Sequence, residues 1–303
     1  MAEHHYHRHL KKEVTHHHEQ GNLVAAFFLN ASFTIIEIAG GIFTNSIAII
    51  SDAVHDLGDT FSLGLAWYAE RLARRKPDSR YTYGYKRFPV LAAMVNSVFL
   101  LAASAFVFTQ AIPLLMHPGK VNETGMIWLA ILGIVFNGAA VLKLKGGKSL
   151  NQRVVRLHLL EDTLGWIAVL AGAIVMKLTG LGWIDPVMGV LIALFIIYNA
   201  SKNLRDTLRI FLQAIPEINN RQALEKSLLS IPGVESFHDV RTWTIDGIIH
   251  VYTLHIVTRP GVFSAEYPAI KEMVRKQLAS YGFGYVTIEI DSYDEFCRLN
   301  HEQ

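Results

Sequence analysis

An apolar stretch from Ser46 to Trp67 carries four ionisable side chains near its middle. This combination restricts the possible folds and functions of the chain more than any other feature. The four are Asp52, His55, Asp56 and Asp59. A stretch of this length and hydropathy indicates a transmembrane helix. An aspartate near the bilayer centre costs at least about 2.5 kcal/mol. Three carboxylates at that depth are therefore expected to have a function.

A pair of residues with the same spacing occurs twice, in two apolar segments about a hundred residues apart. His55 precedes Asp59 by four residues, and His158 precedes Asp162 by four. On a helix, residues four apart lie on one face, one turn from each other. Two such helices facing each other would offer two imidazole nitrogens and two carboxylate oxygens, and zinc takes four ligands of these kinds. The spacing therefore predicts a membrane-embedded metal site.

The composition indicates an integral membrane protein with six spans. Of 303 residues, 51% are hydrophobic and 18% are charged, and the mean hydropathy is +0.28. The net charge of +2 gives no reason to expect nucleic acid as a partner, and the single cysteine, Cys297, excludes a disulfide framework and a thiolate metal site. Six apolar segments are each about long enough to cross the 30 Å hydrocarbon layer of a lipid bilayer. They cover residues 23–43, 47–69, 90–115, 126–144, 154–178 and 186–198, the last with an extension toward residue 204.

Positive charge collects in two of the connections between these segments. Between the second and third segments lie Arg71, Arg74, Arg75, Lys76, Arg80, Lys86 and Arg87, and between the fourth and fifth lie Lys143, Lys145, Lys148, Arg153 and Arg156. The loops on the opposite side contain only Lys120 and Lys177. Because basic loops stay on the cytoplasmic side, we expect both chain ends in the cytoplasm.

Two polar regions flank the six-segment domain, which we place at residues 22–212. Residues 1–21 include seven histidines, a composition typical of a solvated, disordered tail or of loose metal capture. Residues 213–303 predict a cytoplasmic domain with the order αββαβ. Its expected elements are a helix at 219–230, strands at 234–245 and 248–257 joined by the turn Asp246-Gly247, a helix at 265–280 and a strand at 285–290. We expect a small α+β sandwich whose two helices cover one face of the sheet.

These motifs together resemble the cation diffusion facilitator family, in its zinc and cobalt-zinc-cadmium resistance branch. The resemblance extends from Asn22 to Asp291. It includes both His-x-x-x-Asp pairs, residues 51–55, the sequence Tyr83-Gly84-Tyr85-Lys86-Arg87 and the pair Asp185-Pro186. It implies a homodimeric, proton-coupled exporter of divalent metal with a ferredoxin-like cytoplasmic domain. It also implies a location in the bacterial inner membrane.

The resemblance assigns the transport site to His55, Asp59, His158 and Asp162. Some relatives have Asp at the position of His55, and histidine here favours Zn²⁺, with Cd²⁺ or Co²⁺ as further possible substrates. Asp52 is expected either to support a ligand imidazole or to line a wet cavity. Asp56 and Glu161 are read as cavity-lining or inter-helix partners, and Glu37 as a satisfied buried carboxylate. We expect no organic cofactor.

The resemblance also points to two further sites, each incomplete in this chain. A second metal site in the loop before the third span would use Asp78, but Tyr81 and Tyr85 replace its histidines. In the cytoplasmic domain His238 and His255 match metal-binding positions, and His250 and Asp291 are candidate contributors. Tyr285 and Glu289 stand where a histidine often occurs, so both regulatory metal binding and ordinary polar strand residues are open.

Metal binding requires neutral imidazole and ionised carboxylate, so loading the site displaces protons and protonation releases the metal. This predicts metal/proton antiport by alternating access. Two alternatives are an uncoupled metal facilitator and a non-transporting sensor or partner subunit. The complete four-ligand set argues against a silent subunit, and no enzymatic activity is expected.

Overall fold

The computed structural model describes residue 28 and residues 30–143, 150–218 and 220–293. The histidine-rich segment at residues 1–21 lies outside the described residues. The described residues fall into two compact units. The first takes residues up to 68 and residues 95–204, and the second takes residues 69–94 and the chain from residue 205 onward.

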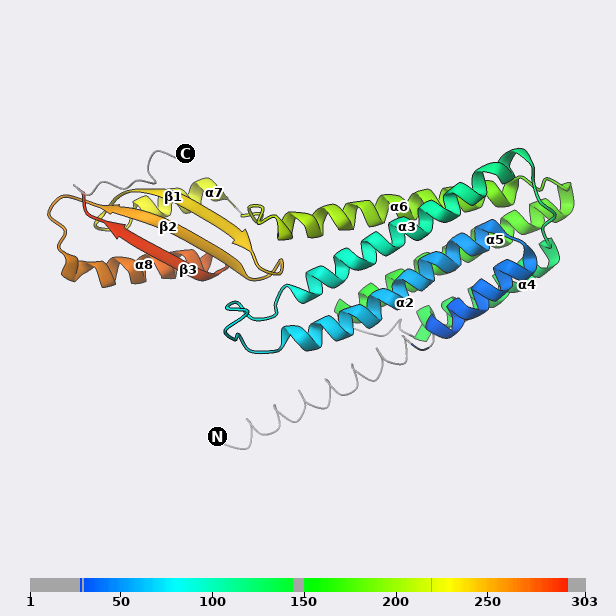
Figure 1. Cartoon of the computed structure of the whole chain (residues 1–303), viewed down its shortest axis with the longest axis horizontal. Helices are drawn as coiled ribbons and strands as arrows, with labels where there is room; N and C mark the ends of the chain where they lie inside the picture. Colours follow the sequence, from blue (N-terminus) through cyan, green and yellow to red (C-terminus); the bar gives the residue numbers. More distant parts are fainter. Residues whose placement is uncertain (1–27, 29, 144–149, 219, 294–303) are drawn as a thin grey trace, which may run out of the picture. The chain divides into compact units, whose positions relative to one another are not determined.

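The first unit is formed by long helices (Figure 1). Residues 30–44 are helical, and five further helices follow along the chain. They are α2 (Ile47–Ala73), α3 (Phe88–Met116), α4 (Glu123–Lys143), α5 (Leu150–Thr179) and α6 (Ile184–Phe211). Four of them, α3 to α6, contain stretches long and apolar enough to cross a membrane. α2 is 27 residues long, but it carries the three aspartates at positions 52, 56 and 59.

Small residues let the helices of this unit approach closely. The indole ring of Trp166 on α5 lies directly over Gly133 on α4, where an added Cβ would be 2.4 Å from the ring. Trp166 is 1% exposed and also makes an edge contact with Phe33. Phe33 in turn stacks on Phe136 of α4. This cluster joins the helix at residues 30–44 to α4 and α5.

Buried hydrogen bonds join the first turns of α2 to the start of α6. Asp185 Oδ2 accepts a hydrogen bond from the Ile47 N–H at 2.8 Å, and Asp185 Oδ1 accepts one from the Ser46 hydroxyl. Further along α2, Ser51 donates to the Gly189 carbonyl at 3.0 Å. Asp185 thereby satisfies helix N-terminal donors of α2 that would otherwise be unpaired in an apolar environment. The segment that carries His55 and Asp59 is anchored to α6 at this end.

The C-terminal domain has the order αββαβ that the sequence predicts. Its elements are α7 (Arg221–Leu229), β1 (Val234–Thr244), β2 (His250–Thr258), α8 (Tyr267–Ser280) and β3 (Phe283–Asp291), with a short helix η1 (Ser264–Glu266) before α8. β1 pairs with β2 in antiparallel orientation, and β2 pairs with β3 in parallel orientation. A ferredoxin-like unit has the order βαββαβ, so that designation stays a prediction for these three described strands.

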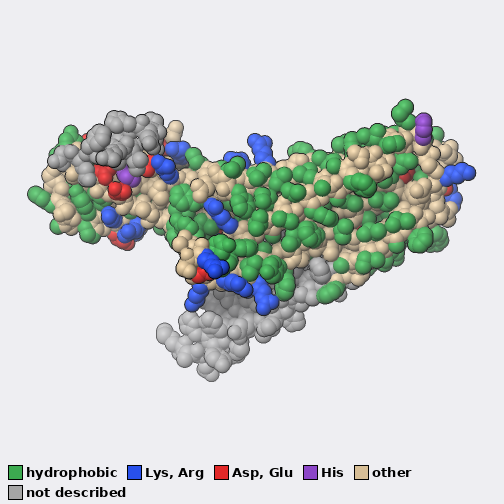
Figure 2. Space-filling view, viewed as in Figure 1, with side chains coloured by type: hydrophobic (Ala, Val, Ile, Leu, Met, Phe, Trp, Pro, Cys, Tyr) green, Lys and Arg blue, Asp and Glu red, His purple; other side chains and the backbone are tan. Residues whose placement is uncertain are grey.

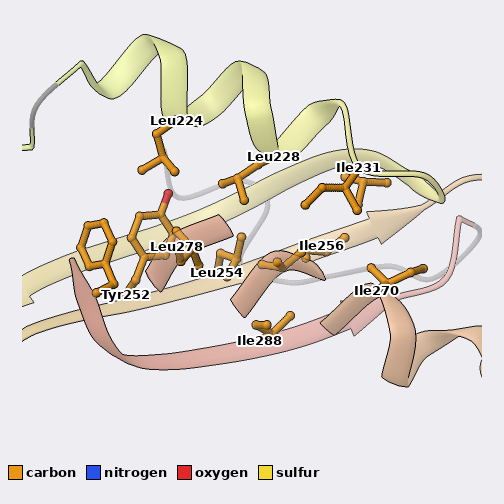
Figure 3. Close-up of a cluster of buried hydrophobic side chains, with 12 residues drawn as sticks. Leu224, Leu228, Ile231, Tyr252, Leu254, Ile256, Ile270, Leu278 and Ile288 are labelled. Carbon is orange, nitrogen blue, oxygen red and sulfur yellow. The ribbon is translucent and has the colours of Figure 1, made fainter. Parts of the chain in front are cut away.

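Both helices of this domain pack on the same face of the sheet. Leu224 and Leu228 of α7 and Leu278 of α8 meet Leu254 and Ile256 of β2 in one buried cluster (Figure 3). Alternate residues of β2 are buried, as a strand with one covered face requires. The prediction of one covered face is confirmed. His255 therefore lies on the face opposite the two helices.

Candidate metal sites

The residues of the predicted transport site come together between α2 and α5. Nε2 of His158 lies 3.1 Å from Oδ2 of Asp59 across the two helices. Along each helix, Nε2 of His55 is 3.6 Å from Asp59 Oδ2, and Nε2 of His158 is 3.7 Å from Asp162 Oδ2. One ligand atom each from His55, Asp59 and His158 lies within 4.8 Å of the others. The i, i+4 spacing brings the donors of each helix to one side, as expected.

The spacing of these donor atoms suits a small tetrahedral cation. Zinc binds nitrogen and oxygen ligands at about 2.0–2.1 Å, which puts neighbouring ligands of a tetrahedron about 3.3 Å apart. The three measured contacts, from 3.1 to 3.7 Å, lie around this value. Asp59 Oδ2 is buried and faces the His158 and His55 imidazoles at 3.1 and 3.6 Å. An anionic acceptor of this kind is available to a cation.

Further carboxylates surround the site without joining it. Asp56 is 3% exposed and Glu37 is fully buried, and their carboxyl groups interact with each other. Glu37 was read from the sequence as a satisfied buried carboxylate, and this reading stays a prediction. Asp52 faces Gly165, where an added Cβ would be 4.0 Å from Asp52 Oδ1. His55 Nδ1 also lacks a partner among the described residues, so the supporting role of Asp52 stays a prediction.

A second group of possible ligands lies on the open face of the C-terminal sheet. The strand register pairs His238 with His255 and His255 with Glu289. Oδ2 of Asp291 is 3.5 Å from His238 Nε2 and 3.6 Å from His255 Nδ1. His238, His255 and Asp291 each offer one ligand atom within 4.8 Å of the others. The structure therefore brings three of the four predicted residues of this site together.

The fourth predicted residue, His250, is not part of this group. It is the first residue of β2, pairs with Thr244 and Phe283, and makes an edge contact with the Phe283 ring. It is five positions before His255 in β2, so the two side chains leave the strand on opposite faces. The expectation that His250 contributes to the site is corrected by this placement.

Two carboxylates that were not predicted complete the surroundings of His255. Its Nε2 lies 3.4 Å from Glu289 and 3.9 Å from Asp239. Asp239 sits in a bulge of β1 with a φ of 44°, and Arg241 holds its other oxygen at 2.9 Å. His255 can thus present Nδ1 to a cation while its Nε2–H points to carboxylates, an arrangement that fixes the tautomer of metal-ligating histidines.

Asp78 in the α2–α3 loop is occupied by hydrogen bonds within that loop. Its Oδ1 accepts from the N–H groups of Arg80 and Tyr81 at 2.9 and 2.8 Å, and its Oδ2 accepts from the Tyr85 hydroxyl at 2.8 Å. The Tyr81 N–H and the Tyr85 hydroxyl lower the pKa of the Asp78 carboxyl, and the carboxylate raises the pKa of Tyr85. Asp78 folds the turn and is not surrounded by other metal ligands among the described residues.

Comparisons with known proteins match most of the chain. The model of the cation efflux transmembrane domain matches residues 23–212, and the model of the cation efflux protein cytoplasmic domain matches residues 216–293. The metal cation efflux system protein CzcD of Cupriavidus metallidurans is 34% identical over 91% of this chain and 89% of its own. The zinc transporter ZitB of Pectobacterium atrosepticum is 34% identical over 94% of this chain and 92% of its own.

Two further similarities come from an antiporter and from a solved domain. The cadmium, cobalt and zinc/H(+)-K(+) antiporter of Bacillus subtilis is 31% identical over 91% of this chain and 92% of its own. The metal-bound C-terminal domain of the CzcD transporter is 27% identical over 24% of this chain and 99% of its own, with a TM-score of 0.22.

Proposed function

The chain belongs to the cation efflux family, and on that premise we propose that it exports Zn²⁺ from the cytoplasm in exchange for protons. Members of this family are transporters, so the chain is a divalent metal exporter and not an enzyme. The proposal concerns the metal that is preferred, the coupling to protons and the residues that bind the cargo.

The observation that carries the proposal is the convergence of His55, Asp59 and His158, with Asp162 beside them, between two helices of a membrane domain. Ionisable groups at that depth are costly and indicate a pathway for ions. Two imidazoles among four ligands favour Zn²⁺ over hard cations such as Mn²⁺. The names of relatives that transport zinc, cadmium and cobalt support the same choice and leave Cd²⁺ and Co²⁺ as possible cargo.

Proton exchange follows from the chemistry of these four ligands. An imidazole binds metal only when neutral, and a carboxylate binds it best when ionised, so metal and protons compete for the same side chains. Metal loading from the cytoplasm releases protons, and protonation from the other side releases the metal. We propose that the helices carrying the ligands rock to expose the site to each side in turn.

We further propose six membrane spans, with the helix at residues 30–44 and α2 added to the four apolar helices. The basic loops support a cytoplasmic location for both ends, and the bacterial relatives support the inner membrane. The ferredoxin-like designation of the C-terminal domain, its homodimer and its regulatory metal site belong to the same proposal. The open face of the sheet, with His238, His255 and Asp291 on it, supports the homodimer and the regulatory metal site.

Flux in reconstituted vesicles tests the proposal against both alternatives. Zinc movement that speeds up when an opposing proton gradient is applied, together with a change of lumenal pH on zinc addition, is the expected result. A zinc flux that does not depend on the pH gradient would indicate an uncoupled facilitator. No flux under either condition, in a preparation that still binds zinc, would leave a sensor or partner subunit.

A further inference from the structure

A strongly basic segment connects α2 to α3, immediately before an apolar membrane-crossing stretch. This segment, called the basic loop here, covers residues 71–87. Its seven cations are Arg71, Arg74, Arg75, Lys76, Arg80, Lys86 and Arg87. Figure 2 shows Lys and Arg side chains gathered at this turn. The segment is joined covalently to the ends of two helices of an integral membrane protein, so it lies at a membrane boundary.

The basic loop has a defined conformation. The three hydrogen bonds to Asp78 described above close the turn, and the Gly84 N–H donates to the Tyr81 carbonyl at 2.8 Å. Gly84 has a φ of 72°, which glycine adopts at little cost. The guanidinium of Arg75 lies 5.9 Å from the Tyr85 ring centre, within the range of a cation–π contact. The cations are therefore held on an ordered turn.

Few negative groups within residues 70–87 compensate this charge. Seven cations face two carboxylates in residues 70–87, Glu70 and Asp78, which leaves a net charge of +5. Glu70 is paired with Arg74 at 3.5 Å, and both oxygens of Asp78 accept hydrogen bonds within the turn. Residues 74–76 and Arg80 are exposed. The carboxylates of this segment therefore do not neutralise its positive charge.

Aromatic side chains beside the cations identify the kind of partner. Trp67 is 60% exposed and Tyr68 57% exposed, about one turn before the cations on α2, and Tyr81 is exposed in the turn itself. Tyr83 is partly exposed and makes an edge contact with Tyr285 of β3. Trp and Tyr prefer the headgroup level of a bilayer, and clusters of four to eight cations next to a span attract anionic lipids. We propose that the basic loop binds the headgroups of anionic phospholipids at the ends of α2 and α3.

Lipid titration of the purified full-length chain tests this surface. Binding of phosphatidylglycerol is compared with binding of phosphatidylcholine by native mass spectrometry, for wild type and for a Lys76→Ala/Arg80→Ala variant. The expected result is a preference for phosphatidylglycerol that falls about 30-fold in the variant, since each cation near the surface contributes about fivefold. The control is Arg275→Ala/Lys276→Ala, which removes two exposed cations from α8 and should bind as wild type.

Three outcomes would overturn the proposal. Equal binding of the two lipids by wild type would remove it, and so would an equal loss in the α8 control, which would mean that net charge alone attracts lipid. Inorganic phosphate at millimolar concentration is added as a competitor, and displacement of the lipid by it would show a site for free phosphate instead.

Asp78→Ala tests the ordered turn. Weaker lipid binding is expected despite the added positive charge, and tighter binding would contradict the role of the turn.

Discussion

Oδ2 of Asp59 on α2 lies 3.1 Å from Nε2 of His158 on α5, so one carboxylate oxygen joins the two helices that carry the candidate transport site. The same oxygen is 3.6 Å from His55 Nε2. Because this single oxygen faces both imidazoles, a change of charge at Asp59 should affect metal binding more than a change elsewhere in the site.

Replacement of Asp59 by asparagine is expected to abolish zinc transport. Asparagine keeps the shape of the side chain but removes the charge that pairs with a divalent cation. Loss of an outer hydrogen-bond partner alone costs about 10- to 100-fold in metal affinity, so loss of a ligand should lower flux by more than about 100-fold. Zinc uptake into proteoliposomes measures this. Glu161→Gln, an exposed carboxylate next to Asp162, is the control and should transport normally; wild-type flux by Asp59→Asn would refute the assignment.

The identity of residue 55 is expected to set metal preference. His55→Asp replaces a borderline nitrogen ligand with a hard oxygen ligand and adds a negative charge. We expect Cd²⁺ and Mn²⁺ to compete better against Zn²⁺ in this variant than in wild type. Flux of labelled zinc in the presence of each competitor gives the profile. An unchanged profile would mean that residue 55 does not select the cargo.

Packing of Trp166 over Gly133 should be necessary for a stable membrane domain. A Cβ on Gly133 would be 2.4 to 2.6 Å from three indole atoms, so Gly133→Ala must displace Trp166, one turn from Asp162. Overpacking of this kind costs about 1–3 kcal/mol. Gly138→Ala in the same helix is the matched control, since its Cβ would meet nothing within 4 Å among the described residues. Thermal denaturation in detergent should separate the two, and equal melting temperatures would contradict the prediction.

Features that depend on local sequence patterns could be predicted, whereas contacts between distant residues could not. The i, i+4 pairs located the donors of the transport site because helical periodicity is local, and alternation located the strands of the αββαβ domain. The Ser46–Asp185 contact joins residues 139 positions apart, and no local pattern encodes it. Asp239 reaches His255 only because a bulge shifts the register of β1, and strand alternation cannot reveal a bulge.

Alkaline pH should weaken the C-terminal domain through Tyr252. This ring is 2% exposed, and burial, with nearby Glu225, raises the pKa of its hydroxyl from 10.0 to about 12. The folded state then keeps a proton that the unfolded state loses, so stability is full below pH 10 and falls as pH rises toward 12. The full difference is about 2–3 kcal/mol. Tyr252→Phe should lose less stability than wild type between pH 9 and 11.5, measured by thermal unfolding. Tyr293→Phe, at an exposed position, should follow wild type, and identical pH profiles for all three would contradict the prediction.

A further prediction concerns the C-terminal domain as a separate fragment. Its buried cluster extends from Leu224 to Ile288, so residues 214–303 contain a complete core and should fold alone. We expect the fragment to be soluble and to dimerise through its uncovered sheet face, and sedimentation with zinc and with chelator measures this. A monomer under both conditions would remove the dimer claim for this domain.

Zinc should strengthen the dimer of that fragment and raise its stability by binding to the cluster on the open face of the sheet. His238, His255 and Asp291 converge there, and a ligand at 100 times its dissociation constant adds about 2.7 kcal/mol of stability. The gain should disappear in His255→Ala and persist in His250→Ala, because His250 is the first residue of β2 and lies outside the cluster, on the other face of the strand. Thermal unfolding with and without zinc compares the two variants. Equal loss in both would show that zinc binds histidines without using this cluster, and a dimer unaffected by zinc would remove the regulatory claim while leaving the dimer.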